Sequence, residues 1–145
     1  MQSTEFQEEI TVFADVIIPV AIPNLYTYRV PREYATSICV GARVIVQFGK
    51  TKVVTAVVAK LHNAPPAKYQ AKYVLELLDD SPLITPQQIE LFHWISEYYM
   101  CTVGEVLNVA LPSGLKISSL SKVQYNPEFS YPELLTEREV LIIEE

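Results

Sequence analysis

The sequence predicts an α+β fold, in which a small twisted β-sheet or half-open barrel of about five strands is covered by two helices. Two observations predict it. Short runs of apolar and β-branched residues, bounded by proline or glycine, fill residues 11–78. From residue 86 the apolar residues recur at helical spacing instead. We therefore expect a frayed leader at residues 1–10 and a single folded domain over residues 11–115.

The five expected strands cover residues 11–20, 25–30, 42–48, 53–61 and 72–78. The first is apolar at nearly every position, which is typical of a strand buried on both faces. Pro19 and Pro23 should end it, because proline cannot continue a hydrogen-bonded ladder. Gly41 should mark a turn, and Gly49 should lie in the hairpin that joins the third and fourth strands.

The helical part carries two N-terminal signals. A threonine is followed three residues later by Gln or Glu in two places, Thr85 with Gln88 and Thr102 with Glu105. This spacing predicts capping boxes. The two helices should run over residues 86–100 and 103–111. We expect the aromatic group of the first helix to pack against the sheet, with Trp94 and one of the two tyrosines largely buried; this group contains Phe92, Trp94, Tyr98 and Tyr99.

The C-terminal part loses this pattern. Residues 116–132 contain serines and prolines that are typical of a linker. Residues 134–145 begin another helix, and the chain ends before any stop signal. We interpret residues 116–145 as a linker and the start of a truncated second domain, so that the chain is a fragment of a longer protein.

Charge is distributed unevenly. The net charge of −6 argues against a nonspecific nucleic-acid binder when the chain is taken as a whole. Residues 34–75, however, hold no acid and six basic residues: Arg43, Lys50, Lys52, Lys60, Lys68 and Lys72. The strand-rich middle is thus a basic island in an acidic chain. A solvated lysine face on a small sheet is the competing interpretation.

Several classes of protein are disfavoured. No run reaches the about 18 apolar residues of a membrane-spanning helix. Cys39 and Cys101 form no metal-binding motif, so we interpret them as reduced, buried thiols of a cytosolic protein. His62 and His93 are isolated, and neither has the partners of a catalytic site. The sequence around Gly49 also lacks the first glycine of a phosphate-binding loop. We therefore expect no enzymatic activity, metal or cofactor in this fragment.

One stretch has the chemistry of a nucleotide site. Residues 23–50 join two strand-like segments, one with Tyr26-Thr27-Tyr28 and the other ending in Phe48-Gly49-Lys50. An aromatic ring can stack on a base, a bare glycine lets a sugar or phosphate approach, and an ammonium group neutralises charge. The alternative is that Tyr26 and Tyr28 are ordinary strand aromatics.

The order of these motifs resembles a known family. The motifs are PNLYTYRVP at residues 23–31, GARVIVQFGK at 41–50, the pair Tyr98-Tyr99, and GEVLNVALP at 104–112. Together they resemble the N-terminal part of the PriA family, the bacterial replication-restart helicases also called primosomal protein N′. The resemblance implies that residues 11–115 are a 3′ DNA-binding domain and that residues 116–145 lead into a winged-helix domain.

The family resemblance also implies a site. The domain would capture the 3′-terminal nucleotide of a nascent leading strand at a stalled fork, using Tyr26, Thr27, Phe48, Gly49, Lys50 and Lys72. Some family members have an aspartate where Thr27 stands. Threonine is a neutral and weaker acceptor for the 3′-hydroxyl, so we expect backbone groups to carry more of the recognition.

For the full-length protein, the resemblance implies an ATP-dependent 3′–5′ DNA helicase of the bacterial cytoplasm, associated with the nucleoid. ATP with Mg²⁺ and zinc would bind outside this fragment. The implied partners are forked DNA with a free 3′ end, other primosome proteins and single-strand DNA-binding protein. The competing hypothesis is a protein-interaction module that docks within a larger assembly without reading DNA ends.

Overall fold

The computed structural model describes residues 11–116. Five strands come first: β1 (Phe13–Ile17), β2 (Tyr26–Arg29), β3 (Arg43–Phe48), β4 (Lys52–His62) and β5 (Val74–Leu77). Two helices follow, α1 (Pro86–Tyr99) and α2 (Val103–Ala110), and short 3₁₀ turns lie at Arg32–Tyr34 and Ser113–Leu115. The predicted α+β class and the five strands are confirmed. The expected leader, linker and second domain lie outside the described residues, apart from Lys116.

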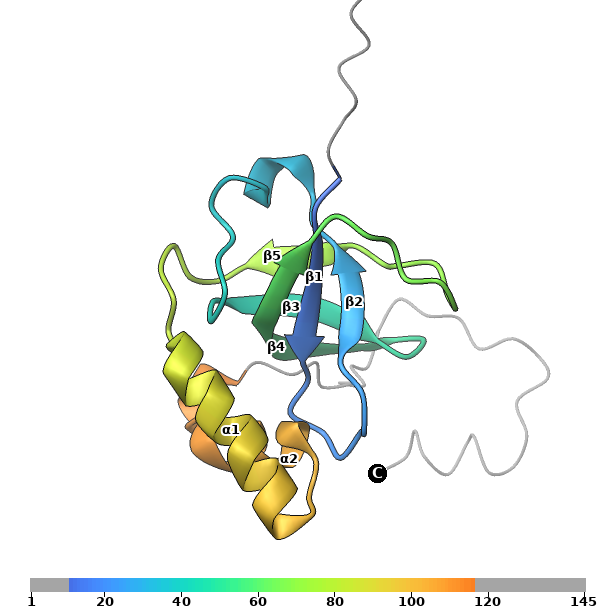
Figure 1. Ribbon diagram of the computed structural model, residues 1–145. Helices are drawn as coiled ribbons and strands as arrows, with labels where there is room; N and C mark the ends of the chain where they lie inside the picture. Colours follow the sequence, from blue (N-terminus) through green and yellow to red (C-terminus); the bar gives the residue numbers. More distant parts are fainter. Residues whose placement is uncertain (1–10, 117–145) are drawn as a thin grey trace, which may run out of the picture.

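The strands form one antiparallel sheet in the order β2-β1-β4-β3-β5. The sheet curls so strongly that its two ends approach each other (Figure 1). A single parallel bridge joins Arg29 of β2 to Tyr73, the residue before β5. This contact nearly closes the sheet, which explains the half-open barrel that the sequence predicted.

The barrel interior is filled by small and β-branched side chains. Alternate residues of β1, β3 and β4 point inward and are almost completely buried, among them Val16, Val44, Val46 and Val58. Such side chains suit a tightly curved sheet because they pack well on a pleated surface. Tyr28 of β2 extends into the same core, with only 4% of its surface exposed.

Both predicted capping boxes are present. The Thr85 hydroxyl accepts from the Gln88 N–H at the start of α1, and the Thr102 hydroxyl accepts from the Glu105 N–H at the start of α2. The helices lie together at one end of the barrel (Figure 1). A second core cluster joins them to the outer side of the sheet, where Ile17 and Val57 meet Leu107 of α2.

The expectation that the α1 aromatics pack against the sheet is wrong for three of the four. Trp94 is 57% exposed, Tyr98 67% and Tyr99 69%, and only Phe92 is buried. The reason is that α1 packs mainly against α2, and α2 in turn contacts the sheet. A helix that touches one neighbour buries a narrow stripe, here Ile89 and Phe92.

A polar clamp holds the segment between the sheet and the helices. The Arg43 guanidinium donates to both carboxylate oxygens of Asp79, at 2.9 and 2.7 Å, and to the Leu115 carbonyl at 3.0 Å. Gly41 lies beside it with φ of +89°, and an added Cβ would stand 1.7 Å from the Ile84 oxygen. The chain thus needs glycine at this turn both for its backbone angle and for space.

The predicted element ends differ slightly from those observed. β1 is shorter than residues 11–20, because beyond Ile17 the backbone bends and Val20 donates its N–H to the Ile18 carbonyl. Cys39 and Cys101 are free thiols, but both are partly exposed rather than buried.

Candidate nucleic-acid interface

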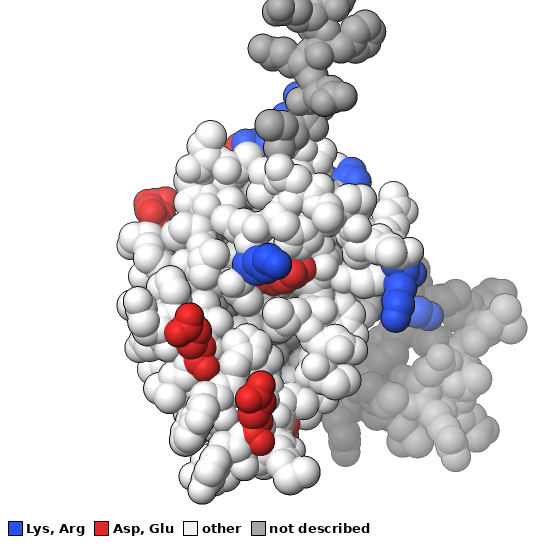
Figure 2. Space-filling model, viewed as in Figure 1, with Lys and Arg blue, Asp and Glu red and all other residues white. Residues whose placement is uncertain are grey.

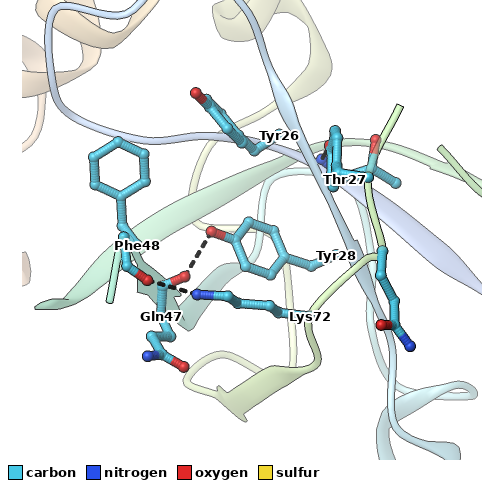
Figure 3. Close-up of a pocket in the computed structure, with 9 residues that line it drawn as sticks. Tyr26, Thr27, Tyr28, Gln47, Phe48 and Lys72 are labelled. Atoms are coloured by element: carbon cyan, nitrogen blue, oxygen red, sulfur yellow. Dashed lines mark hydrogen bonds between the residues drawn. The ribbon is translucent and has the colours of Figure 1, made fainter. Parts of the chain in front are cut away.

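A pocket of about 400 Å³ opens at the edge of the barrel. This volume lies within the about 300–1,000 Å³ that is typical of small-ligand sites. Three elements line it: strand β2, the turn between β3 and β4, and the loop at residues 63–73 that precedes β5 (Figure 3). The lining residues are Tyr26, Thr27, Tyr28, Gln47, Phe48, Gly49, Tyr69, Gln70 and Lys72.

Aromatic rings form much of the pocket wall. The Tyr26 ring meets the edge of Phe48, with 5.6 Å between the ring centroids. Tyr69 tilts toward Tyr26 from the loop at 6.3 Å. Their flat apolar surfaces are the kind on which a base stacks without regard to its identity.

Tyr28 supports this wall from inside the barrel. Its hydroxyl donates to the Gln47 carbonyl at 2.9 Å. Burial raises the pKa of Tyr28 to about 12, and the neighbouring Tyr69 and Tyr26 add to the shift. Tyr28 therefore stays a neutral hydrogen-bond donor at neutral pH, and it ties β2 to β3 across the open side of the barrel.

Lys72 provides the positive charge of the pocket. Its ammonium group donates to the Gly49 carbonyl at 2.6 Å, and its own carbonyl accepts from the Arg29 N–H at 2.7 Å. In Figure 3 the side chains of Lys72 and Tyr28 both extend toward the β3–β4 turn. An ammonium group has three donors, so two remain for a ligand. Within the described residues, Lys72 is the only charged side chain in the lining.

Thr27 contacts a neighbouring strand as well as the pocket. It lies opposite Asp15 in the β1–β2 ladder, and its hydroxyl donates to Asp15 Oδ1 at 2.6 Å. Its backbone N–H donates to the Tyr69 hydroxyl at 2.7 Å. Both the side chain and the backbone of Thr27 are therefore held in place by named partners.

Asp15 belongs to a small polar network on the outer face of the sheet. His62 Nε2 lies 3.0 Å from Asp15 Oδ1, and the Ala64 N–H donates to His62 Nδ1 at 3.3 Å, which leaves the imidazole hydrogen on Nε2. Burial alone would raise the pKa of Asp15, but the hydrogen bonds from Thr27 and His62 and the nearby charges of His62 and Lys60 hold it below 3.8. The carboxylate is thus ionised at neutral pH.

The structure brings together five of the six residues named from the sequence. Tyr26, Thr27, Phe48, Gly49 and Lys72 all line the pocket, whereas Lys50 does not. Lys50 is exposed in the turn beyond Gly49, and its carbonyl accepts from the Gln47 side chain.

Sequence reasoning missed four lining residues, Tyr28, Gln47, Tyr69 and Gln70. Tyr28 and Gln47 alternate with recognised positions on the same strands, so the β period could have found them. Tyr69 and Gln70 lie in a loop without periodicity, where only their nearness to Lys72 was informative.

The charge of the surface follows the same division. Figure 2 shows acidic side chains over the helical pair, and basic side chains on the side where the β3–β4 turn and the residue 63–73 loop project. The basic island of the sequence is therefore spatially separate from the acidic helices, which suits the approach of a phosphate backbone to the pocket side.

Comparison with known proteins defines the class of this domain. Residues 15–112 match the family model described as the 3′ DNA-binding domain of PriA. The chain belongs to this family, and its role is DNA binding in replication restart.

Relatives match over the same region. The chain is 36% identical over 101 residues to the replication restart protein PriA of Haemophilus influenzae, covering 70% of this chain and 14% of the relative. It is 32% identical over 107 residues to the replication restart protein PriA of Bacillus subtilis, covering 72% of this chain and 13% of the relative. The matched region is thus about one seventh of each of these relatives.

Two further findings concern the described residues alone. No helix within residues 11–116 has the length and apolar character that a membrane crossing requires. No group of three His, Cys, Asp or Glu side chains comes together there as a metal site would require.

Proposed function

We propose that this domain binds the 3′-terminal nucleotide of a nascent leading strand at a stalled replication fork. The observation that carries the proposal is the pocket itself, a concave site with aromatic walls, one lysine and a glycine turn. Tyr26 stacks on the terminal base, and the backbone near Thr27 and Gly49 encloses the terminal sugar. Lys72 binds the adjacent phosphate through its two remaining donors.

The size of the site favours end binding over binding along a strand. A protein that tracks a strand needs a long basic groove with repeated stacking positions. Here one pocket of about 400 Å³ carries a single lysine. An acidic chain tolerates such a site because few phosphates are contacted.

The decisive experiment titrates the 145-residue chain with one labelled oligonucleotide in three forms, with a 3′-hydroxyl, a 3′-phosphate or a 5′-phosphate. We expect the 3′-phosphate to bind much less well than the free 3′-hydroxyl, and the 5′-phosphate to have little effect. All four bases at the 3′ end should bind with similar affinity, because stacking is tolerant of base identity. Equal affinity for all three forms would show that no terminus is read.

A second candidate function is docking to another protein, and one observation favours it. Trp94 and Tyr98 stack on each other on the exposed face of α1, with ring centroids 5.2 Å apart. Exposed aromatic groups are common at protein interfaces. Other primosome proteins and single-strand DNA-binding protein are the candidate partners. Replacing both residues by alanine should then impair replication restart in cells while the purified chain still binds DNA.

The activity of the longer protein is a separate proposal. By family resemblance we propose an ATP-dependent helicase that uses ATP with Mg²⁺ and carries zinc outside residues 1–145. In this proposal the protein acts at the nucleoid in the cytoplasm.

A further inference from the structure

The hydroxyl of Thr27 has a fixed direction. A threonine hydroxyl has one hydrogen and two lone pairs. The hydrogen points to Asp15 Oδ1 at 2.6 Å, so only lone pairs remain for any other partner. Thr27 also lines the pocket, whereas Asp15 does not. A group in the pocket that meets this oxygen must therefore donate a hydrogen to it.

Asp15 cannot reverse this bond. An ionised carboxylate holds no hydrogen and can only accept. His62 donates from Nε2 to the same Oδ1 atom, and Lys60 lies opposite Asp15 in the β1–β4 ladder, so the carboxylate is held in its charged form. Its side chain is 24% exposed, which keeps its charge effective at short range.

From this arrangement we propose that Asp15 is a positioning residue that makes the pocket selective for a hydroxyl-bearing terminus. The proposal rests on the proposed function, since it assigns the recognition of the 3′-hydroxyl to one hydrogen-bonded chain. The terminal hydroxyl donates to Thr27 Oγ1, and Thr27 donates to Asp15. A bond of this kind is strengthened when its acceptor is itself polarised by a second bond.

The same chain of hydrogen bonds rejects a terminal phosphate for two reasons. A phosphate monoester is largely deprotonated near pH 7 and offers mainly acceptors, so it meets the Thr27 lone pairs without a hydrogen between them. It also brings negative charge near the Asp15 carboxylate. Removing Asp15 frees the Thr27 hydroxyl to rotate and to donate into the pocket.

The test measures affinity ratios rather than affinities. Each variant is titrated with the same oligonucleotide ending in a 3′-hydroxyl, a 3′-deoxy nucleotide or a 3′-phosphate. For the unchanged chain we expect the 3′-deoxy end to bind about 3- to 10-fold more weakly than the 3′-hydroxyl end, the value of one hydrogen bond. In Asp15→Ala this ratio should fall to within about twofold, and the penalty for a 3′-phosphate should shrink.

Two variants separate orientation from charge. Asp15→Asn keeps an acceptor oxygen for Thr27 but removes the negative charge, so the preference for hydroxyl over deoxy should remain while the phosphate penalty falls. Thr27→Val keeps the β-branched shape and removes the hydroxyl, so the hydroxyl preference should disappear. The double variant Asp15→Ala with Thr27→Val should lose no more of that preference than either single variant.

Two controls keep the shape or the charge unchanged. Thr27→Ser retains the hydroxyl and should retain the ratio. Glu76→Gln on β5 changes the net charge by the same amount as Asp15→Asn, but Glu76 is exposed and does not line the pocket, so both ratios should stay as in the unchanged chain. Thr27→Val gives the answer even if Asp15→Ala fails to fold.

The outcomes distinguish the two levels of the proposal. If the unchanged chain does not discriminate among the three ends, the proposed end reading fails and this inference fails with it. If the unchanged chain discriminates and Asp15→Ala or Thr27→Val still does so to the same extent, end reading stands and the hydrogen-bonded chain is overturned. Loss of the hydroxyl preference in Asp15→Asn would also overturn it, because charge rather than orientation would then be responsible.

Discussion

The domain presents two aromatic surfaces that differ in everything except composition. At the pocket, Tyr26, Phe48 and Tyr69 surround a concave space and alternate with hydrogen-bonded polar groups. On α1, Trp94 and Tyr98 lie on a convex helix surface with acidic neighbours on the same helix. Both surfaces expose rings to solvent, but only the first combines them with a lysine and backbone groups that face one space.

This difference shows what an aromatic cluster needs in order to bind a nucleotide. A ring supplies stacking area, but a defined pose also requires polar partners at fixed positions and walls that exclude water. The helical side instead holds the barrel in shape through α2. We therefore expect changes on the helical side to act on stability and changes at the pocket to act on DNA binding.

The largest effect is expected at Gly104, where α2 touches the barrel. An added Cβ would stand 2.2 Å from the Val20 oxygen and 2.3 Å from the Ile18 oxygen. Gly104→Ala should lower the free energy of unfolding by about 3 kcal/mol or more, although alanine favours helix by about 1 kcal/mol. Urea denaturation measures this loss. Gly114→Ala is the control, because an added Cβ there meets open space; equal stability of the two variants would contradict the close contact.

The next effect is expected at the clamp between Arg43 and Asp79, whose side chains are each 15% exposed. Asp79→Asn should cost about 2–3 kcal/mol, because the guanidinium loses its charged partner. Hydrogen bonds from Arg43 lower the pKa of Asp79 below 3.8, against the opposing effect of burial. A carboxyl group with a lowered folded-state pKa contributes stability above its unfolded pKa, and this stability is lost as pH falls through the folded pKa.

Thermal unfolding between neutral pH and pH 3 checks this sign. The unchanged chain should lose more stability on acidification than Asp79→Asn, which has no carboxyl group to protonate at this position. Asp15 also has a lowered pKa and contributes in the same direction in both proteins, so it cancels in the comparison. Parallel pH curves would assign the clamp no electrostatic role.

A direct test of the two aromatic surfaces compares Tyr26→Ala with Trp94→Ala. Loss of a stacked base should weaken binding of a 3′-hydroxyl oligonucleotide by about 1–3 kcal/mol in the first variant. The second variant should bind as the unchanged chain does, since Trp94 does not line the pocket. Fluorescence anisotropy at constant salt measures both. A larger effect from Trp94 would reverse the assignment of the two surfaces.

The smallest effect separates Lys72 from Lys50. Replacing a lysine that contacts phosphate should make the salt dependence of DNA binding shallower by roughly one unit. We expect this for Lys72→Ala, because its ammonium lies in the pocket beside the Gly49 carbonyl. Lys50 was predicted to behave alike, and Lys50→Ala tests whether a phosphate outside the pocket also reaches the turn. An unchanged slope would mark Lys50 as a bystander.

Local rules predicted much of the fold. Alternation located the strands, and the Thr85 and Thr102 spacings located both helix starts, because capping depends on residues three positions apart. The burial of Trp94 was predicted wrongly for a related reason. Helical spacing shows which residues share a face, but it does not show which neighbour covers that face.

The candidate site was predictable where it depends on short motifs. Tyr26 and Gly49 stand in recognisable segments, and Lys72 was placed by family resemblance. The partnership of Thr27 with Asp15 depends on the register between strands, and the position of Tyr69 depends on the path of a loop. Neither is written in local sequence, because both arise only after the sheet has curled.

The loop at residues 63–73 has a consequence for solubility during folding and assembly. β2 is an edge strand, and an edge strand with free N–H groups can recruit an extended segment of another chain. Here the Thr27 N–H is taken by a tyrosine hydroxyl and the Arg29 N–H by the Lys72 carbonyl. A side chain at the first position leaves a hollow where a sixth strand would leave none. The same edge that is protected from aggregation therefore provides the room in which a nucleotide fits.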